Sequence, residues 1–306
     1  MSAMKRLNYY FTIILVTFIT IFSFFNMFQI VSLSSQVINI VVENLLPSLL
    51  PFMILISLCL SLGIMNLFSY FIQFLFLPFF HLSPIMSSIY FMSFFCGYPT
   101  KVKMIKEAYQ LHYIDLSQLQ HLLHIASFAS VSFIFVSLKL EHPFLIYFCH
   151  IMPSILMALT YQKKAKKQTL QESLEILKRP HKSFVVALKE SMLSSIYAFV
   201  FILGYMLVFQ FIGYALTPII QDPKLLAIIQ GFLEFSSGTL NLSHYPMTPL
   251  LSSIICFHLS FSGISVMMQT DNLLEGIPYR FSSYLKARLF HACLSFILCF
   301  LLTSYL

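Results

Sequence analysis

Residues 184–214 read FVVALKESMLSSIYAFVFILGYMLVFQFIGY, and from Ile196 onward they contain no charged residue. A run of about 20 apolar residues is long enough to cross the hydrocarbon core of a bilayer as a helix. Such runs recur along the 306-residue chain, which is 58% hydrophobic and 9% charged, with a mean hydropathy of +0.85. Because a soluble domain carries about 25% charged residues, the composition excludes a soluble globular protein and indicates an integral membrane protein.

The apolar runs predict an all-α polytopic membrane protein with about ten membrane segments. They lie near residues 8–33, 38–63, 64–81, 85–107, 117–138, 142–161, 184–214, 222–239, 248–270 and 284–305. Two segments contain breaks: 85–107 carries Gly97-Tyr98-Pro99 in its middle, and the short 222–239 carries Glu234 and Gly238. A broken or re-entrant helix persists in a membrane only where protein or a watery cavity satisfies its freed backbone groups.

The basic residues predict the orientation in the membrane. The loop at 162–183 is rich in lysine, and the positive-inside rule places it in the cytoplasm. Its basic residues are Lys163, Lys164, Lys166, Lys167, Lys178, Arg179 and Lys182. Six predicted spans separate this loop from the N-terminus, so Lys5 and Arg6 are expected in the cytoplasm as well. They stand at the start of an apolar run that we interpret as an uncleaved first helix. The basic residues behind the net charge of +7 therefore serve mainly to orient the protein in the membrane. They are not interleaved with aromatic residues, so they do not indicate a nucleic-acid partner.

Two arguments conflict over residues 271–284. Arg280, Lys286 and Arg288 favour the cytoplasmic side, which requires 222–239 to be re-entrant. Internal symmetry favours the outer side, and we adopt the symmetry as the expectation.

The chain has the layout of an internal repeat. Residues 94–105 (FFCGYPTKVKMI) and 259–269 (LSFSGISVMMQ) each place a glycine break in a long apolar segment. The predicted units are an N-terminal anchor helix (1–37), a first repeat (38–138), a linking helix with the basic cytoplasmic loop (139–183) and a second repeat (184–306). Because an odd number of spans separates the repeats, the second is inverted. Inverted repeats with paired broken helices are typical of secondary transporters that bind substrate near the membrane midplane.

The polar residues near these breaks are the candidate site. A carboxylate inside a membrane is costly, so Glu234 is expected to bind a coupling cation, carry a proton or pair with a lysine. Glu43 is a candidate for coupling or gating, with a solvated helix start as the alternative. Substrate binding is predicted for Gly97, Tyr98, Pro99, Thr100, Lys103, Glu234, Ser236, Gly238, Ser262, Gly263, Ser265 and Gln269. In the alternative interpretation, the small residues only allow close helix packing and the lysines only extend to the cytoplasmic interface.

No sequence pattern indicates catalysis or a cofactor. His121 and His124 lie three residues apart without a third ligand, so we interpret them as a polar helix face rather than a metal site. The six cysteines form no CxxC pair and are expected to pack as small apolar residues. Motifs of common hydrolases and nucleotide-binding loops are also missing. The sequence therefore predicts neither an enzyme nor a metal or cofactor site.

Several short patches resemble the YlbJ-like sporulation integral membrane proteins, which carry the nucleoside-recognition (Gate) domain. They are LLPSLLPF at 45–52, GYPT at 97–100 with Lys103, GFLE at 231–234 with Gly238, and SFSGISV at 260–266 with Gln269. Together they cover about residues 40–270, and both repeats are then Gate-like. The sequence departs from the family at Lys101 and Ser262, where glycine is usual.

The resemblance implies an architecture similar to concentrative nucleoside transporters and the movement of a small organic anion, dipicolinate, across the outer forespore membrane. The expected location is thus the bacterial cytoplasmic membrane, and the expected partners are the anionic substrate and the lipid bilayer. A coupling cation or proton and a homo-oligomeric state are compatible with this interpretation. A transporter of a nucleoside-like solute, and a non-transporting scaffold of the sporulation machinery that acts through the 162–183 loop, remain as alternatives.

Overall fold

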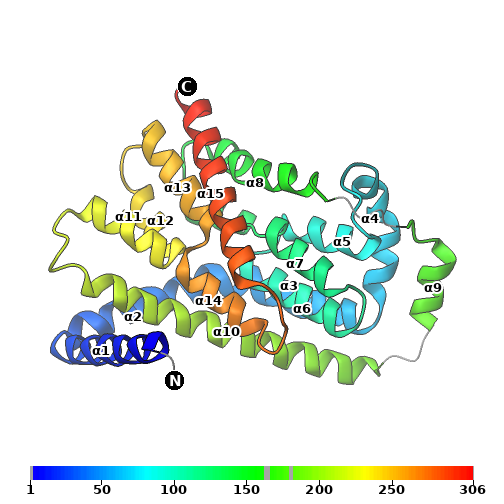
Figure 1. The fold of residues 1–306 in the computed structure, drawn as a ribbon, viewed down its shortest axis with the longest axis horizontal. Helices are drawn as coiled ribbons and strands as arrows, with labels where there is room; N and C mark the ends of the chain where they lie inside the picture. Colours follow the sequence, from blue (N-terminus) through cyan, green and yellow to red (C-terminus); the bar gives the residue numbers. More distant parts are fainter. Residues whose placement is uncertain (1–2, 162–165, 179–181, 306) are drawn as a thin grey trace.

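The computed structural model describes residues 3–161, 166–178 and 182–305, and the regular structure of these residues is helical throughout (Figure 1). Three basic residues of the predicted cytoplasmic loop, Lys163, Lys164 and Arg179, lie outside the described residues. The N-terminal helices are α1 (Ala3–Phe25), α2 (Met27–Ile40), the π-helical turn η1 (Val41–Leu45), α3 (Leu46–Ser61), α4 (Ile64–Phe80), α5 (Pro84–Ser93), α6 (Tyr98–Gln110) and α7 (Leu116–Ile125). They are followed by the π-helical turn η2 (Phe133–Ser137), α8 (Pro143–Ala158), α9 (Leu170–Lys178), α10 (Phe184–Ala215), α11 (Pro223–Leu233), α12 (Phe235–Ser243), α13 (Pro249–Phe261), α14 (Gly263–Leu273) and α15 (Phe281–Thr303).

Among the described residues, three helical stretches are long and apolar enough to cross a membrane: Phe184–Ala215, Pro249–Leu273 and Phe281–Thr303. The number rises to five if each of two bent helix pairs is one span; these bend by 102° after Phe25 and by 99° after Ser61. The protein is therefore a helical membrane protein with fewer long spans than the ten segments that hydropathy predicts. The difference arises because several predicted segments are divided into half-helices or bend sharply, as the first segment does near Asn26.

The predicted breaks occur, and each has a local cause. α6 begins after Gly97, with Pro99 in its first turn, where a missing N–H leaves no helical hydrogen bond unmade. α13 and α14 are divided where Ser262 and Gly263 adopt left-handed backbone angles, φ 73° and 76°. One expectation was wrong: 117–138 is no continuous span, because α7 ends at Ile125 and no regular helix forms until after Ser130.

α11 and α12 form a helical hairpin with Glu234 at its tip. The backbones of Gly231 and Gly238 touch, and a Cβ added at Gly238 would lie 2.3 Å from the Cα of Gly231. The first residues of α11 and the last of α12 line one common surface pocket, so the chain enters and leaves on the same side.

The contacts of residues 271–284 show at which end of the fold this segment lies. The backbone N–H of Arg280 donates to the side chain of Gln120 in α7 at 2.7 Å, and Asn272 and Glu275 share a pocket with Lys103 of α6. This segment thus lies at the same end of the fold as the lysines of α6. It does not lie at the opposite end, which the symmetry argument favoured.

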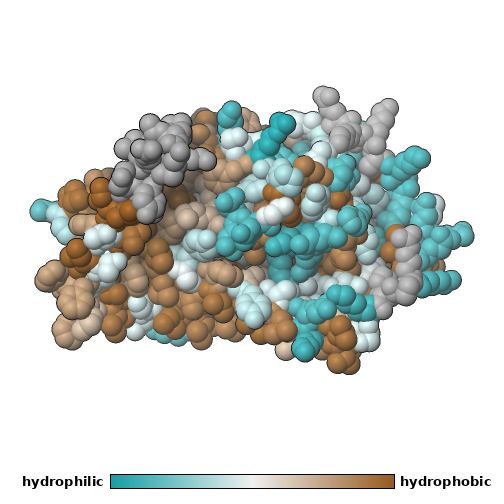
Figure 2. Space-filling model, turned by 60° about the horizontal axis from the view of Figure 1, so that its bottom comes forward, coloured by the Kyte–Doolittle hydropathy of each residue, from teal (hydrophilic) through white to brown (hydrophobic). Residues whose placement is uncertain are grey.

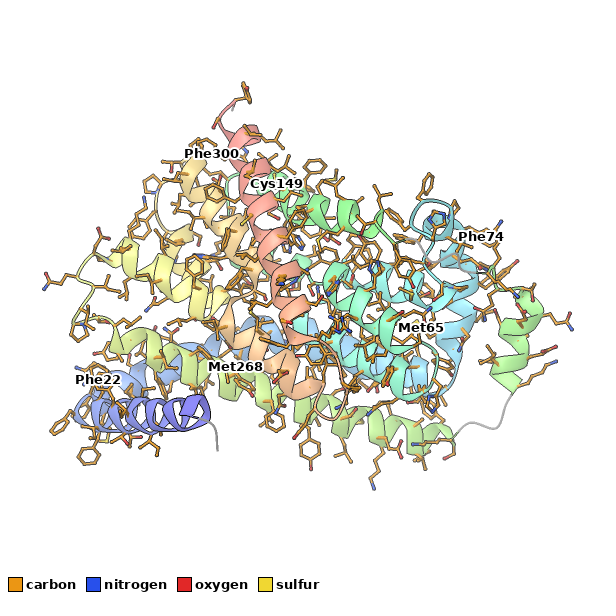
Figure 3. The ribbon with its side chains drawn as sticks, in the orientation of Figure 1. Phe22, Met65, Phe74, Cys149, Met268 and Phe300 are labelled. Carbon is orange, nitrogen blue, oxygen red and sulfur yellow. The ribbon has the colours of Figure 1, made fainter. Side chains whose placement is uncertain are left out.

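Apolar side chains cover much of the outside of the fold. Hydrophobic residues dominate the left part of the face shown in Figure 2, and hydrophilic residues gather toward its right end. Exposed phenylalanines occur far apart, for example Phe74 on α4 and Phe300 on α15 (Figure 3). Charged side chains such as Lys101, Glu234 and Arg288 are instead buried. Apolar groups outside and paired polar groups inside are expected for a protein surrounded by lipid.

Candidate functional site

A small cavity of about 40 Å³ lies where the broken helices meet. Six of the predicted site residues line it: Gly97, Tyr98, Pro99, Glu234, Ser236 and Gln269. The remaining wall comes from η1, α3, α10, α14 and the segment around Ser130. Since a water molecule needs about 10–15 Å³ of such volume, the cavity has room for roughly three waters.

The starts of α6 and α12 meet at this cavity from opposite directions. From the cavity, α6 runs toward Lys103 and Glu107, whereas α12 runs toward Asn241 and the pocket shared with α2. The rings of Tyr98 and Phe235, at the first position of each helix, pack edge to face with centroids 5.4 Å apart. Two helix N-termini, each carrying a partial positive charge, therefore face the same small space.

Glu234 caps the start of α12. Its carboxylate accepts hydrogen bonds from the backbone N–H of Ser236 at 3.2 Å, the N–H of Ser237 at 2.8 Å and the hydroxyl of Ser236 at 2.6 Å. The residue is only 2% exposed, and no described cation forms an ion pair with it. The carboxylate thus supplies the negative charge that balances the N-terminus of α12.

The start of α6 lacks such a cap. Gly97, which has no side chain, stands at the cap position, and the described residues provide no side-chain cap for this helix. Nearby, the hydroxyl of Thr100 and the amide oxygen of Gln269 are buried without a hydrogen-bond partner among the described residues. The Gln269 amide nitrogen donates to Ser265 at 3.1 Å. The cavity therefore borders one N-terminus without a countercharge and one unpaired acceptor, the amide oxygen of Gln269.

Other predicted site residues lie away from the cavity wall. Lys103 pairs with Glu107 in a different pocket, with 2.5 Å between Nζ and Oε1. Glu43 is exposed in the π-helical turn. Gly238 packs inside the hairpin, and Gly263 packs against its tip, where a Cβ would lie 3.1 Å from Leu233 O. Ser262 forms the break in front of Gly263, so these three small residues shape the site rather than line it.

Two buried cations near the cavity were not among the predicted site residues. Lys101 is fully buried, where the sequence allowed a lysine that reaches the interface; its Nζ donates to Phe128 O at 2.6 Å and lies 4.7 Å from the Tyr98 ring centroid. Arg288 of α15 is also fully buried, and its guanidinium donates to Ser127 O at 3.0 Å, Ser260 O at 3.4 Å and His124 O. Neither has a carboxylate partner among the described residues, whose ion pairs are Lys103–Glu107 and Lys182–Glu190.

Further side chains hold the irregular segment 126–130 in place. His150 of α8 accepts from the Ala129 N–H at 3.0 Å, so its other ring nitrogen carries the proton and donates to Ser260 at 2.8 Å. The Ser154 hydroxyl donates to Ile125 O. The backbone groups that the break frees are thus satisfied inside the protein, as a membrane interior requires.

The sequence carries a signal that would have found this segment. Residues 127–132 read SFASVS and residues 260–265 read SFSGIS, and each hexapeptide lies at a helix break. Downstream, α8 carries His150 and Ser154, and α15 carries His291 and Ser295 with the same spacing. The rings of the two histidines stack 5.7 Å apart. The closer residue-level match to 260–265 is therefore 127–132, and not the 94–105 stretch that we matched to it.

The two hexapeptides belong to helices that run in opposite directions. α7 runs parallel to α15, because Gln120 contacts Arg280 and Ser127 contacts Arg288.

α13 instead runs antiparallel to α15. Ser260 hydrogen-bonds Ser295, whereas Ser253, earlier in α13, lies close to Cys299, later in α15. α7 and α13 therefore point in opposite directions.

Two larger pockets lie on either side of the cavity along α10. Ser194 to Phe201 line a pocket of about 410 Å³ with Lys103, Lys106 and Glu107, here called the lysine vestibule. Gln210 to Thr217 line a pocket of about 480 Å³ with Tyr245 and His244, here called the tyrosine vestibule. Ile202 and Met206, between these stretches, line the small cavity.

Comparison with known proteins assigns no family, since no family model, curated protein or solved structure matches the chain. Within the described residues, no three His, Cys, Asp or Glu side chains are grouped so that they could hold a metal ion.

Proposed function

We propose that the protein is a membrane transporter that moves a small organic anion between the two vestibules. The observation that carries this proposal is the order of spaces along α10: a vestibule, a much smaller cavity bordered by helix breaks, and a second vestibule. With a rise of about 1.5 Å per residue, residues 198 and 210 lie roughly 18 Å apart. A permanent pore would join the vestibules, whereas a transporter keeps a barrier between them.

The local pairing of the two halves supports an inverted-repeat transporter. In this proposal α7 and η2 correspond to α13 and α14, and α8 corresponds to α15. The first repeat would then extend through α8 rather than end at residue 138. The tips at Gly97 and Glu234 would be the two entrances to the substrate site.

An anion is the favoured substrate class because of the charges around the cavity. Glu234 already balances the start of α12, and the start of α6 has no countercharge. The buried Thr100 hydroxyl, which has no partner among the described residues, can donate a hydrogen bond to an anion there. A carboxylate bound there would accept hydrogen bonds from the first turn of α6, and its ring would lie beside Tyr98 and Phe235.

Dipicolinate is the specific candidate, and the support for it is the resemblance to the YlbJ-like proteins. It is a flat aromatic dianion, which suits a helix N-terminus next to aromatic rings. The cavity of about 40 Å³ is smaller than this molecule, so binding requires the hairpin tip and α6 to separate. In the proposed orientation the lysine vestibule faces the cytoplasm, together with the basic loop, in the outer forespore membrane of a sporulating cell.

The test is uptake of dipicolinate, with nucleosides as controls, into liposomes that contain the purified protein. Glu234→Gln is expected to reduce uptake more than tenfold, because the cap loses its charge and one strong acceptor. The matched control is Glu190→Gln, which neutralises an exposed carboxylate paired with Lys182 and should leave uptake unchanged. Correctly inserted wild-type protein that takes up neither solute would overturn the proposal and favour the scaffold.

A further inference from the structure

The two buried cations lie at the negative ends of half-helices. α7 ends at Ile125 and α13 ends at Phe261, and the carbonyl groups at both ends point toward the same buried region. Arg288 donates to His124 O and Ser127 O from the first end and to Ser260 O from the second. Lys101 donates to Phe128 O in the same break as Ser127. Each cation is therefore held by neutral carbonyl oxygens and helix dipoles.

Carbonyl groups at unwound helix ends are the ligands with which membrane transporters commonly bind a coupling Na⁺. From this geometry we infer that Arg288 and Lys101 are built-in cations that occupy these carbonyl positions in place of a metal cation. The carbonyls of Ser127, Phe128 and Ser260 already accept hydrogen bonds from charged donors, so no metal cation binds at these two breaks. This deepens the proposed function: anion transport does not use Na⁺ or K⁺ held there.

Of the two buried cations, Arg288 is the one that contacts carbonyl oxygens at both helix breaks. Its planar guanidinium has five N–H donors in a fixed fork, and it reaches the equivalent serine carbonyl of both SFxxxS hexapeptides, Ser127 and Ser260. A burial this complete without a carboxylate would be strongly unfavourable unless dipoles replaced the countercharge. Two converging helix C-termini, each worth about half an elementary charge, provide that replacement.

The first test is thermal denaturation of the full-length protein in detergent. The melting temperature of the wild-type protein is expected to be the same in NaCl, KCl and choline chloride at equal ionic strength. Arg288→Ala should melt at a lower temperature, and millimolar guanidinium chloride should raise that temperature in proportion to its occupancy of the vacated site. Choline chloride at the same concentration should not.

Lys286→Ala is the matched control, since it removes an exposed cation from the same helix, and guanidinium should not stabilise it. Arg288→Gln is the second variant, for use if the alanine variant does not fold, and guanidinium should again raise its melting temperature. Stabilisation of the wild-type protein by Na⁺ or K⁺ over choline would overturn the inference. So would a folded Arg288 variant that guanidinium fails to stabilise.

Transport gives a separate measurement. Dipicolinate uptake by the wild-type protein should be unchanged when choline replaces Na⁺ and K⁺ on both sides of the membrane, and a loss of uptake would overturn the inference. If the protein takes up no dipicolinate in any salt, the proposed function fails, whereas the melting experiments still decide whether the two side chains replace a metal cation.

Discussion

The contact between Gly231 and Gly238 makes the hairpin α11–α12 unusually sensitive to one methyl group. In Gly238→Ala the new Cβ would lie 2.3 Å from the Cα and N of Gly231 and 3.0 Å from Ala227 O. Ordinary contacts begin near 3.4 Å, so the two helices must separate by about 1 Å. Overpacking of this kind costs up to about 3 kcal/mol, and the better helix propensity of alanine returns about 1 kcal/mol.

The expected net loss of stability is about 2 kcal/mol, which for a chain of 306 residues lowers the melting temperature by roughly 3 °C. The melting temperature is measured by heating the protein in detergent and determining the folded fraction by size-exclusion chromatography. Gly204→Ala in α10 is the control, because its Cβ would meet no atom within 4 Å; it should melt at the wild-type temperature or slightly above. A Gly238→Ala protein as stable as Gly204→Ala would refute the close hairpin packing.

Three further predictions test other contacts. Lys103→Gln should leave dipicolinate uptake within about twofold of wild type, because Lys103 lies outside the cavity; a loss as large as that of a cavity residue would restore it to the substrate site. His150→Ala should lower the melting temperature by several degrees, since it leaves the buried Ala129 N–H without an acceptor at a cost of about 1–3 kcal/mol; an unchanged value would mean that this hydrogen bond contributes nothing. Gln73→Ala should speed proteolysis at 166–178 several-fold without changing uptake, since Gln73 makes two 2.8 Å hydrogen bonds to the backbone of Gln168; equal cleavage rates would show that these bonds do not hold the loop.

The sequence predicted the positions of the helix breaks better than the number of membrane spans. Gly97-Tyr98-Pro99, Glu234 and Ser262 are recognisable because each places a glycine, a proline or a charge inside an apolar run. The break after Ile125 was missed because its residues, Ala-Ser-Phe-Ala-Ser, are compatible with a helix. The unwound form is stabilised by tertiary partners on other helices: Lys101 donates to Phe128 O, and His150 accepts from the Ala129 N–H.

The cavity residues were also recognised more readily than the buried cations. Glu234 and Gln269 stand alone among apolar residues, so their cost in a membrane reveals them. Lys101 and Arg288 each lie near other basic residues in the sequence, and such clusters normally mark the cytoplasmic side of a membrane protein. Only the packing distinguishes Lys101, which is buried, from Lys106, which lines a vestibule.

The reach of Arg288 to both serine carbonyls has a consequence for how such a chain could arise by duplication. A position that contacts both copies of a repeat has space for a single side chain. Two identical subunits would each bring a guanidinium to the same place and repel one another. At the matching position of α8 the chain carries Tyr147, whose hydroxyl donates to Phe94 O at 2.6 Å instead. In the proposed inverted repeat, the two halves must therefore differ at this position for the fold to hold one central charge.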